Sequence, residues 1–205
     1  LILGQHIGAP CTATVAKRDV VAEGAVVGEV KKGLGVPLHA PVAGKIKNLA
    51  TSVHPVRVSS PSITLEVDKE AEPLRYQHKD WNGLSSSELL GKIHDAGIIG
   101  IGGAGFPTHV KLTPPSDAPV DTLVLNGAEC EPYITADHRQ MLENPHEIVE
   151  GAKIILKILG ISECYIGIES NKPDAIREMN QAAQDGSNSK YTIKVQTLQV
   201  KYPQG

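Results

Sequence analysis

The spacing of apolar residues changes near residue 70, and this change most restricts the folds open to the chain. Residues 1–70 contain short apolar runs and alternations separated by glycine and proline, a pattern typical of β-strands joined by tight turns. After about residue 85, strand-like runs alternate with amphipathic helical segments, which favours a layered α/β domain with a mainly parallel sheet. We therefore predict an α+β chain of two domains: an all-β unit at residues 1–70, a charged linker at 71–84 and an α/β domain at 85–205.

Capping and turn residues mark the ends of several helices and strands in residues 85–205. Asn144 and Pro145 predict the start of an amphipathic helix, because asparagine is a favoured N-cap and proline is favoured at the first helical position. Gly160 marks its end. The other expected elements are a helix from Ser85 or Ser86 to Gly97, strands at residues 122–125, 164–168 and 191–200, and a helix from Pro173 to about residue 184.

Composition excludes several classes of function. The 205 residues are 40% hydrophobic, enough for a core, and the net charge is only -3 with lysine and arginine scattered, so nucleic acid is not an expected partner. Cys11, Cys130 and Cys164 are far apart, which disfavours a disulfide framework or a local metal site. No apolar run reaches the roughly 20 residues of a membrane span. We expect a soluble segment, with docking onto a membrane complex left open.

Residues 1–70, called the first block below, contain two half-motifs that resemble a lipoyl- or biotinyl-type barrel-sandwich domain. They lie at residues 19–30 and 40–46. In such carriers a lysine at a hairpin tip bears the prosthetic group, but here Gly33 stands at that place and Lys32 is one residue away. We therefore predict an unmodified barrel-sandwich hybrid that packs or docks. A carrier function would instead predict a mass increment on Lys32.

A glycine-rich segment at residues 97–111, called the glycine loop below, is the strongest motif. Its five glycines let backbone N–H groups turn inward toward an anion, and Lys111 adds a positive charge. The segment follows a helix rather than a strand, so it lacks the context of a Rossmann dinucleotide fingerprint, and it has no G-K-[ST] ending. Spacing alone leaves a structural turn and a phosphate cradle equally open.

An acidic segment at residues 126–137, called the acidic loop below, directly follows a predicted buried strand. Ligands of open α/β sheets bind at the carboxyl ends of the strands. Glu129 and Glu131 are two residues apart, so an extended backbone would point both carboxylates to the same side. They could hydrogen-bond hydroxyl or amide groups of a ligand. A solvated acidic turn is the alternative, and the position at a strand end favours function.

The two loops, in this order, resemble one known family. Residues 102–108 with Lys111, followed by residues 126–132, resemble the C subunit of the Rnf electron-transport complex (RnfC) and, more distantly, the flavin-binding subunit of respiratory complex I. Residues 4–10 and 201–205 are also similar to the Rnf protein, so the resemblance covers essentially the whole chain. It implies that residues 85–205 form a nucleotide-binding domain that holds FMN, with NADH stacking near the flavin.

The resemblance also implies roles for individual residues. Four residues of the glycine loop would contact the FMN phosphate and ribityl chain, three of the acidic loop would line the flavin pocket, and two near residue 205 would begin a later loop that completes the site. In that order they are Gly100, Gly102, Gly103 and Lys111; Asn126, Glu129 and Glu131; and Tyr202 and Gly205. No side chain is expected to act as a general acid or base, and no metal ligand is expected in this segment, because the cofactor supplies the chemistry.

The implied activity is that of a multi-subunit oxidoreductase. FMN would exchange a hydride with NADH and pass single electrons to 4Fe-4S clusters, which belong to the full-length family member and not to this segment. The partners would be other Rnf subunits, at the cytoplasmic face of the bacterial cell membrane, in an ion-translocating complex. The isolated segment is expected to be inactive.

Some residues depart from the family pattern. Ile101 stands where the complex I relative has arginine, and Ala128 stands where it has aspartate. The family's Tyr-Pro-x-Gly run continues into a Gly-Glu segment beyond Gly205, so we expect this chain to be a piece of a longer subunit. The alternative function is a non-catalytic docking scaffold with a vestigial flavin pocket, as a related subunit of a sodium-pumping quinone reductase shows for this architecture.

Overall fold

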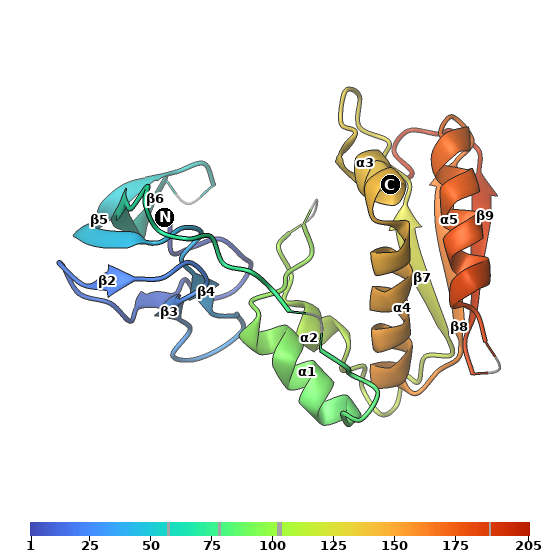
Figure 1. The fold of residues 1–205 in the computed structure, drawn as a ribbon, viewed down its shortest axis with the longest axis horizontal. Helices are drawn as coiled ribbons and strands as arrows, with labels where there is room; N and C mark the ends of the chain where they lie inside the picture. Colours follow the sequence, from blue (N-terminus) through green and yellow to red (C-terminus); the bar gives the residue numbers. More distant parts are fainter. Residues whose placement is uncertain (57, 78, 102–103, 189) are drawn as a thin grey trace. The chain divides into compact units, whose positions relative to one another are not determined.

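The computed structural model describes residues 1–56, 58–77, 79–101, 104–188 and 190–205. The chain divides into two compact units, Leu1–Thr113 and Pro114–Gly205, and Figure 1 shows the elements of each. The first unit contains antiparallel sheets and two helices, and the second contains a parallel sheet with three helices. The predicted α+β composition is therefore confirmed.

The first block folds as two three-stranded antiparallel sheets, which confirms the expected all-β unit; the described strands do not form one closed barrel. One sheet has the order β1-β3-β4 and the other β2-β5-β6. The strands are β1 (Thr12–Ala13), β2 (Val20–Val21), β3 (Val26–Glu29), β4 (Leu38–His39), β5 (Gly44–His54) and β6 (Val58–Val67).

The core of this block forms where short apolar segments of both sheets face inward. Its buried residues are Leu3, Cys11, Val21, Val27, Ala40, Ile46 and Ile63. The long β5–β6 hairpin extends beyond this core, and its strands alternate between buried and exposed only near Ile46 and Ile63. Lys32 lies exposed in the connection between β3 and β4, where Gly33 has a φ of +93°.

Helices α1 (Ser86–Asp95) and α2 (Thr108–Lys111) complete the first unit. Ser85 caps α1 in a capping box: its side chain accepts a hydrogen bond from the Glu88 N–H, and the Glu88 carboxylate accepts one from the Ser85 N–H. Gly97, at a φ of +70°, ends the helix as expected. Although the sequence groups α1 and the glycine loop with the α/β domain, their contacts place them in the unit of the first block.

The second unit is a parallel three-stranded sheet of order β7-β8-β9. The connecting helices α4 and α5 lie over one face of it (Figure 1), as right-handed crossovers between sequential strands require. The elements are β7 (Thr122–Gly127), α3 (Ala136–Glu143), α4 (Pro145–Leu159), β8 (Glu163–Glu169), α5 (Pro173–Gly186) and β9 (Thr192–Leu198). The predicted parallel α/β layer is confirmed.

The ends of α4 follow the sequence signals in part. Pro145 is the first helical residue and Gly160 adopts the left-handed conformation, both as expected. Asn144 does not cap α4 through its side chain; its amide instead donates to the Gln140 side chain of α3. The reason is that α3, which was not predicted, ends at Glu143 and leaves Asn144 between two helices.

No helix within the described ranges combines the length and the apolar character needed to cross a bilayer.

Candidate functional site

Two backbone hydrogen bonds join the two sides of the glycine loop in the first unit. The Gly100 N–H donates to the Phe106 carbonyl at 2.9 Å, and the Thr108 N–H donates to the Ile98 carbonyl at 3.0 Å. The Gly100 N–H is therefore engaged inside the loop, and the contact of Gly100 with the FMN phosphate or ribityl chain stays a prediction. Gly102 and Gly103, predicted to contact the phosphate, lie outside the described residues.

Lys111 brings a positive charge close to Gly100 in this loop. From the end of α2 its ammonium group lies beside Gly100, 3.3 Å from the position that a Cβ atom would occupy there. A larger side chain at residue 100 would contact this ammonium group. The combination of a bare backbone with an adjacent cation suits a phosphate group.

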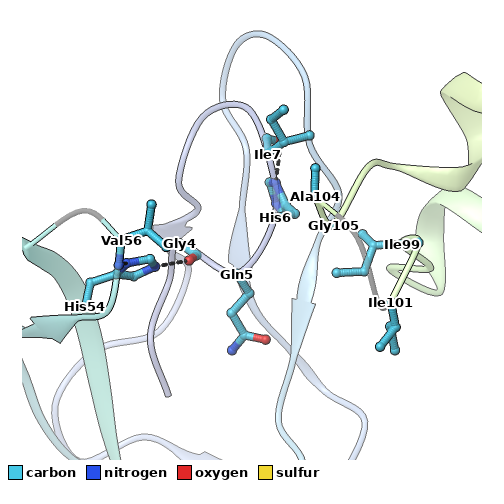
Figure 2. A pocket seen from close by; sticks show the side chains of 11 residues that line it. Gly4, Gln5, His6, Ile7, His54, Val56, Ile99, Ile101, Ala104 and Gly105 are labelled. Atoms are coloured by element: carbon cyan, nitrogen blue, oxygen red, sulfur yellow. Dashed lines mark hydrogen bonds between the residues drawn. The ribbon is translucent and has the colours of Figure 1, made fainter. Parts of the chain in front are cut away.

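A pocket of about 530 Å³ opens beside the loop. Figure 2 shows that its walls come from two parts of the first unit. The glycine loop contributes Ile99 and Ile101, and the first block contributes segment 4–7 and the tip of the β5–β6 hairpin at His54 and Val56. The lining is mainly apolar next to backbone polar groups, as in many sites for small ligands.

The acidic loop begins at the carboxyl end of β7 in the second unit. Asn126 is exposed, and its side-chain oxygen accepts a hydrogen bond from the Ala128 N–H at 3.1 Å. The Glu129 carboxylate accepts from the N–H groups of Asp137 at 2.8 Å and His138 at 3.2 Å. Glu129 thus binds the N-terminus of α3, which has no side-chain cap of its own at Thr135.

Glu129 and Glu131 line the same pocket, and that an extended backbone points both carboxylates to one side stays a prediction. The backbone bends at Glu131 and turns at Pro132 and Tyr133, and Tyr133 has a φ of +64°. Side chains two residues apart point to the same side only in an extended strand. Glu131 is exposed, whereas Glu129 is half-buried against α3.

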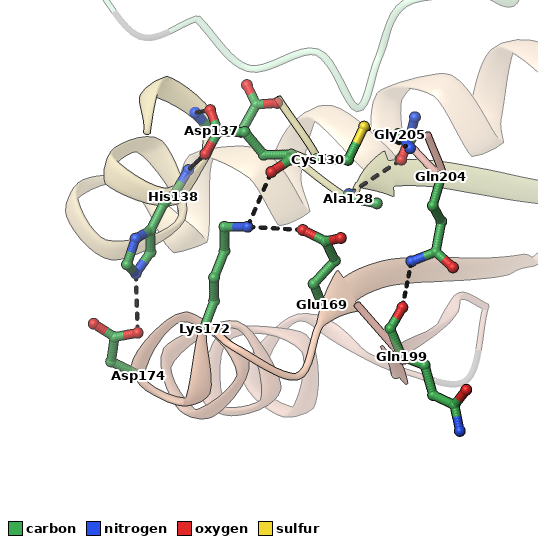
Figure 3. A network of polar contacts seen from close by, with 12 residues as sticks. Ala128, Cys130, Asp137, His138, Glu169, Lys172, Asp174, Gln199, Gln204 and Gly205 are labelled. Atoms are coloured by element: carbon green, nitrogen blue, oxygen red, sulfur yellow. Dashed lines mark hydrogen bonds and ion pairs between the residues drawn. The ribbon is translucent and has the colours of Figure 1, made fainter. Parts of the chain in front are cut away.

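A buried ion pair supports the acidic loop from below, as Figure 3 shows. The Lys172 ammonium donates to a Glu169 carboxylate oxygen at 3.0 Å and to the Glu129 carbonyl at 3.3 Å. Lys172 is 6% exposed and Glu169 1%. The other Glu169 oxygen, Oε1, has no hydrogen-bond partner among the described residues. This pair was not predicted from the sequence, although Glu169 directly follows the strand expected at residues 164–168 and so lies, like Asn126, at a strand end where ligands of such sheets bind.

The C-terminal segment returns to the acidic loop. The Gly205 N–H donates to the Cys130 sulfur at 3.3 Å, and a Cβ atom at residue 205 would come within 2.1 Å of the Ala128 carbonyl oxygen. Tyr202 lines a pocket of about 320 Å³ together with Glu129, Glu131 and Lys172. The structure therefore brings Tyr202 and Gly205 to the predicted acidic residues.

The predicted site residues form two groups, one in each compact unit. Gly100 and Lys111 lie in the first unit, and Asn126, Glu129, Glu131, Tyr202 and Gly205 lie in the second. That both groups line one cleft stays a prediction.

The surroundings of the N-terminus of α3 shift the pKa values of two carboxyl groups, Asp137 and Asp174, in opposite directions. Burial, and then the nearby Glu129 carboxylate, raise the pKa of Asp137, while Lys172 partly opposes this. A hydrogen bond from His138, at 2.9 Å, lowers the pKa of Asp174. The ionised form is therefore disfavoured at Asp137 and favoured at Asp174.

These shifts predict opposite effects of pH on two variants. Because the folded state raises the pKa of Asp137, its ionised form costs stability at neutral pH, and Asp137→Asn should increase the free energy of unfolding at pH 7. The gain should shrink as the pH falls through the folded-state pKa and vanish below the unfolded-state value. Asp174→Asn should lower stability at pH 7, and this loss should vanish as the pH falls through its lowered pKa.

Urea unfolding followed by circular dichroism measures both effects. A series from about pH 2.5 to about pH 7 covers the range over which carboxyl groups titrate. The same sign for both variants at pH 7 would contradict the assignment.

Family models match two parts of the chain, and one of these matches includes residues of both compact units. Residues 93–205 match the family model of the Nuo51 FMN-binding domain, and residues 1–70 match that of the RnfC barrel sandwich hybrid domain. The chain belongs to the RnfC family. The resemblance drawn from the two loops is thereby confirmed, and so are the barrel-sandwich hybrid and the FMN-binding domain as family assignments.

Named relatives of the RnfC family match almost the whole chain. Over 98% of its length it is 43% identical to the C subunit of the proton-translocating ferredoxin:NAD(+) oxidoreductase complex of Clostridium ljungdahlii, and 41% identical over 98% to the Na(+)-translocating counterpart of Acetobacterium woodii. The C subunit of the ion-translocating oxidoreductase complex of Haemophilus influenzae is 39% identical over 99% of the chain. The chain spans 43%, 45% and 24% of these relatives, respectively.

Proposed function

We propose that this chain is the nucleotide-binding part of an RnfC protein, and that it binds FMN and serves NAD(H)-linked electron transfer. The observation that carries the proposal is the match of residues 93–205 to an FMN-binding domain, a range that includes all nine predicted site residues. FMN, when bound, exchanges two electrons with a nicotinamide and single electrons with iron–sulfur centres. Those centres would lie in other parts of the full-length protein.

The described residues fit such a ligand. Lys111 beside the bare backbone of Gly100 suits the phosphate. Asn126 and Glu131, both exposed on the acidic loop, offer an amide and a carboxylate to the polar edge of a flavin. Lys172 holds the Glu129 carbonyl and so fixes where this edge would lie. Tyr202 and Gly205 extend the same wall. The domain limits at residues 70 and 85, and a single cleft between the two groups, belong to the proposal.

In the whole protein, these residues would work in a peripheral position at the cytoplasmic face of the cell membrane, with other Rnf subunits and NADH as partners. The competing function is a docking scaffold without flavin. Two observations favour it: the Gly100 N–H and the Glu129 carboxylate are both engaged inside the protein. A direct binding measurement decides between them.

Flavin titration of this chain and of the full-length protein tests the proposal. We expect FMN fluorescence to be quenched on binding, at least by the full-length protein. Lys111→Ala should weaken FMN about tenfold, equal to about 1.4 kcal/mol, because a charge-assisted hydrogen bond to the phosphate is lost. Riboflavin, which has no phosphate, should bind the Lys111→Ala variant and the unmodified protein with equal affinity.

Lys92→Ala is the matched control, since Lys92 is an exposed lysine of α1 in the same unit. It should leave both affinities unchanged. Failure of the full-length protein to bind FMN at all would instead establish the scaffold.

A further inference from the structure

The glycine loop is fitted closely to the first block. The Ile7 N–H donates to the Gly105 carbonyl at 3.3 Å. Gly105 is buried with a φ of +65°, and a Cβ atom there would lie 3.1 Å from the His6 Cα and 3.3 Å from the Gln5 carbonyl oxygen. A side chain here would be strained at this φ and crowded against segment 5–6, so glycine is the residue that suits this position. The backbone of Gly105 and the backbone of residues 5–7 therefore pack directly against each other.

The hairpin tip on the other side of the pocket is also fixed in place. His54 Nδ1 accepts a hydrogen bond from the Val56 N–H at 3.0 Å, so the ring proton is on Nε2, which donates to the Gly4 carbonyl at 2.8 Å. His54 thus ties the β5–β6 tip to the segment that contacts the loop. Figure 2 shows His54 and Val56 facing Ile99 and Ile101 across the pocket.

The pocket wall supplied by the first block is apolar where it meets solvent. Val56 is 85% exposed and Ile7 43%, and Ile101 on the loop is 95% exposed. These branched side chains surround a space of about 530 Å³ beside the Gly100 backbone and the Lys111 ammonium. An apolar wall next to an anion-binding loop suits one ligand chemistry: a flat heteroaromatic ring that carries a phosphate group.

We propose that the first block forms one wall of the nucleotide site, and that Ile7 and Val56 hold the heteroaromatic ring of the nucleotide whose phosphate lies at the glycine loop. This inference rests on the proposed function. It gives the barrel-sandwich hybrid a direct part in ligand binding, and the exposed Ile101 of the glycine loop adds to the same apolar wall. The ring is either the flavin of FMN or the adenine of NAD(H), and the two probes below distinguish them.

The test replaces Val56 with asparagine in the full-length protein. Asparagine is close in size and uncharged, so it removes the apolar contact without repelling a phosphate. The matched control is Val53→Asn, because Val53 lies on the same hairpin, is 84% exposed and does not line the pocket. FMN and ADP-ribose, which is the adenine half of NAD(H) without nicotinamide, serve as probes in binding titrations.

Val56→Asn should weaken one probe about five- to tenfold, with Val53→Asn within twofold of the unmodified protein. Weakened FMN identifies the flavin ring, and weakened ADP-ribose identifies adenine. Equal binding of both probes by the two variants would overturn the inference while leaving the proposed function intact. No binding by the unmodified protein would overturn the proposed function itself, together with this inference.

Hydrogen exchange gives a second readout that needs no variant. The proposal requires that the bound nucleotide slow exchange at the amides around Val56 and Ile7 as well as in the glycine loop. Slowing confined to the glycine loop would contradict it.

Discussion

Lys172→Met is expected to lower the free energy of unfolding of the Pro114–Gly205 unit by about 3–5 kcal/mol. The substitution removes the partner of Glu169, which is 1% exposed and whose Oε1 already has no partner among the described residues. A buried carboxylate without a cation keeps its desolvation cost and loses its compensation. The Glu129 carbonyl loses a donor as well, so the acidic loop should become less ordered and FMN affinity should fall.

Lys153→Met is the matched control for this loss. Lys153 pairs with Glu150 at the same three-residue spacing, but Glu150 is half-exposed on the surface of α4. An ion pair of this kind contributes less than about 1 kcal/mol. Urea unfolding followed at the helix signal compares the two variants, since α3, α4 and α5 all belong to this unit. Equal losses would mean that burial of the Lys172–Glu169 pair is not what matters.

The double variant Glu169→Gln with Lys172→Met isolates the unpaired charge. A neutral side chain at residue 169 removes the charge that Lys172→Met leaves behind, so the double variant should be more stable than Lys172→Met alone. It should not regain flavin affinity, because the donor to the Glu129 carbonyl is still absent. These two readouts separate the stability of the unit from the positioning of the loop.

Gly127→Ala is expected to be the second severe substitution. A Cβ atom at residue 127 would lie 2.8 Å from the Gly167 carbonyl oxygen of the neighbouring strand, with Met141 and Ile168 close behind. Backbone cannot move aside as a flexible side chain can, so β7 must shift against β8, at a cost of about 1–3 kcal/mol. Because the acidic loop starts here, flavin affinity should fall with stability.

Gly151→Ala provides the opposite control. Gly151 lies within α4, and nothing lies within 4 Å of its added Cβ. Alanine is favoured over glycine in a helix by about 1 kcal/mol, so this variant should be more stable and bind FMN as before. Thermal unfolding monitored by circular dichroism, with flavin titration, measures both. A Gly127→Ala protein as stable as the unmodified chain would contradict the close contact between β7 and β8.

Local signals in the sequence were sufficient for most of the fold. Pro145, Gly160 and the Ser85 capping box each act within a few residues of their own position, and the structure has α4 and α1 at the expected places. Helix α3 was missed because its stability comes from elsewhere: it buries only Met141, and its N-terminus is capped by Glu129, which lies outside the helix. No periodicity of apolar residues could reveal such a helix.

The candidate site was predictable to the extent that it consists of short motifs. The glycine and acidic loops were found from their residues, but the use of the Gly100 N–H and the Glu129 carboxylate depends on hydrogen bonds formed only in the folded chain. Glu169 and Lys172 are only three positions apart, but their burial depends on how the whole unit packs. The contact between Ile7 and Gly105 joins two distant segments through three-dimensional packing. Residues almost a hundred positions apart carry no mutual signal in a single sequence.

The three thiols differ sharply in their surroundings. Cys11 and Cys164 are buried. Burial, and then the nearby Glu29 carboxylate, raise the pKa of Cys11, and burial raises the pKa of Cys164 to about 11, so neither forms the reactive thiolate readily near neutral pH. Cys130 is only partly covered, and its sulfur accepts the hydrogen bond from Gly205. A maleimide dye added to the native protein would therefore attach at Cys130, next to the acidic loop, and would replace the sulfur's hydrogen bond with the C-terminal segment without any engineered residue.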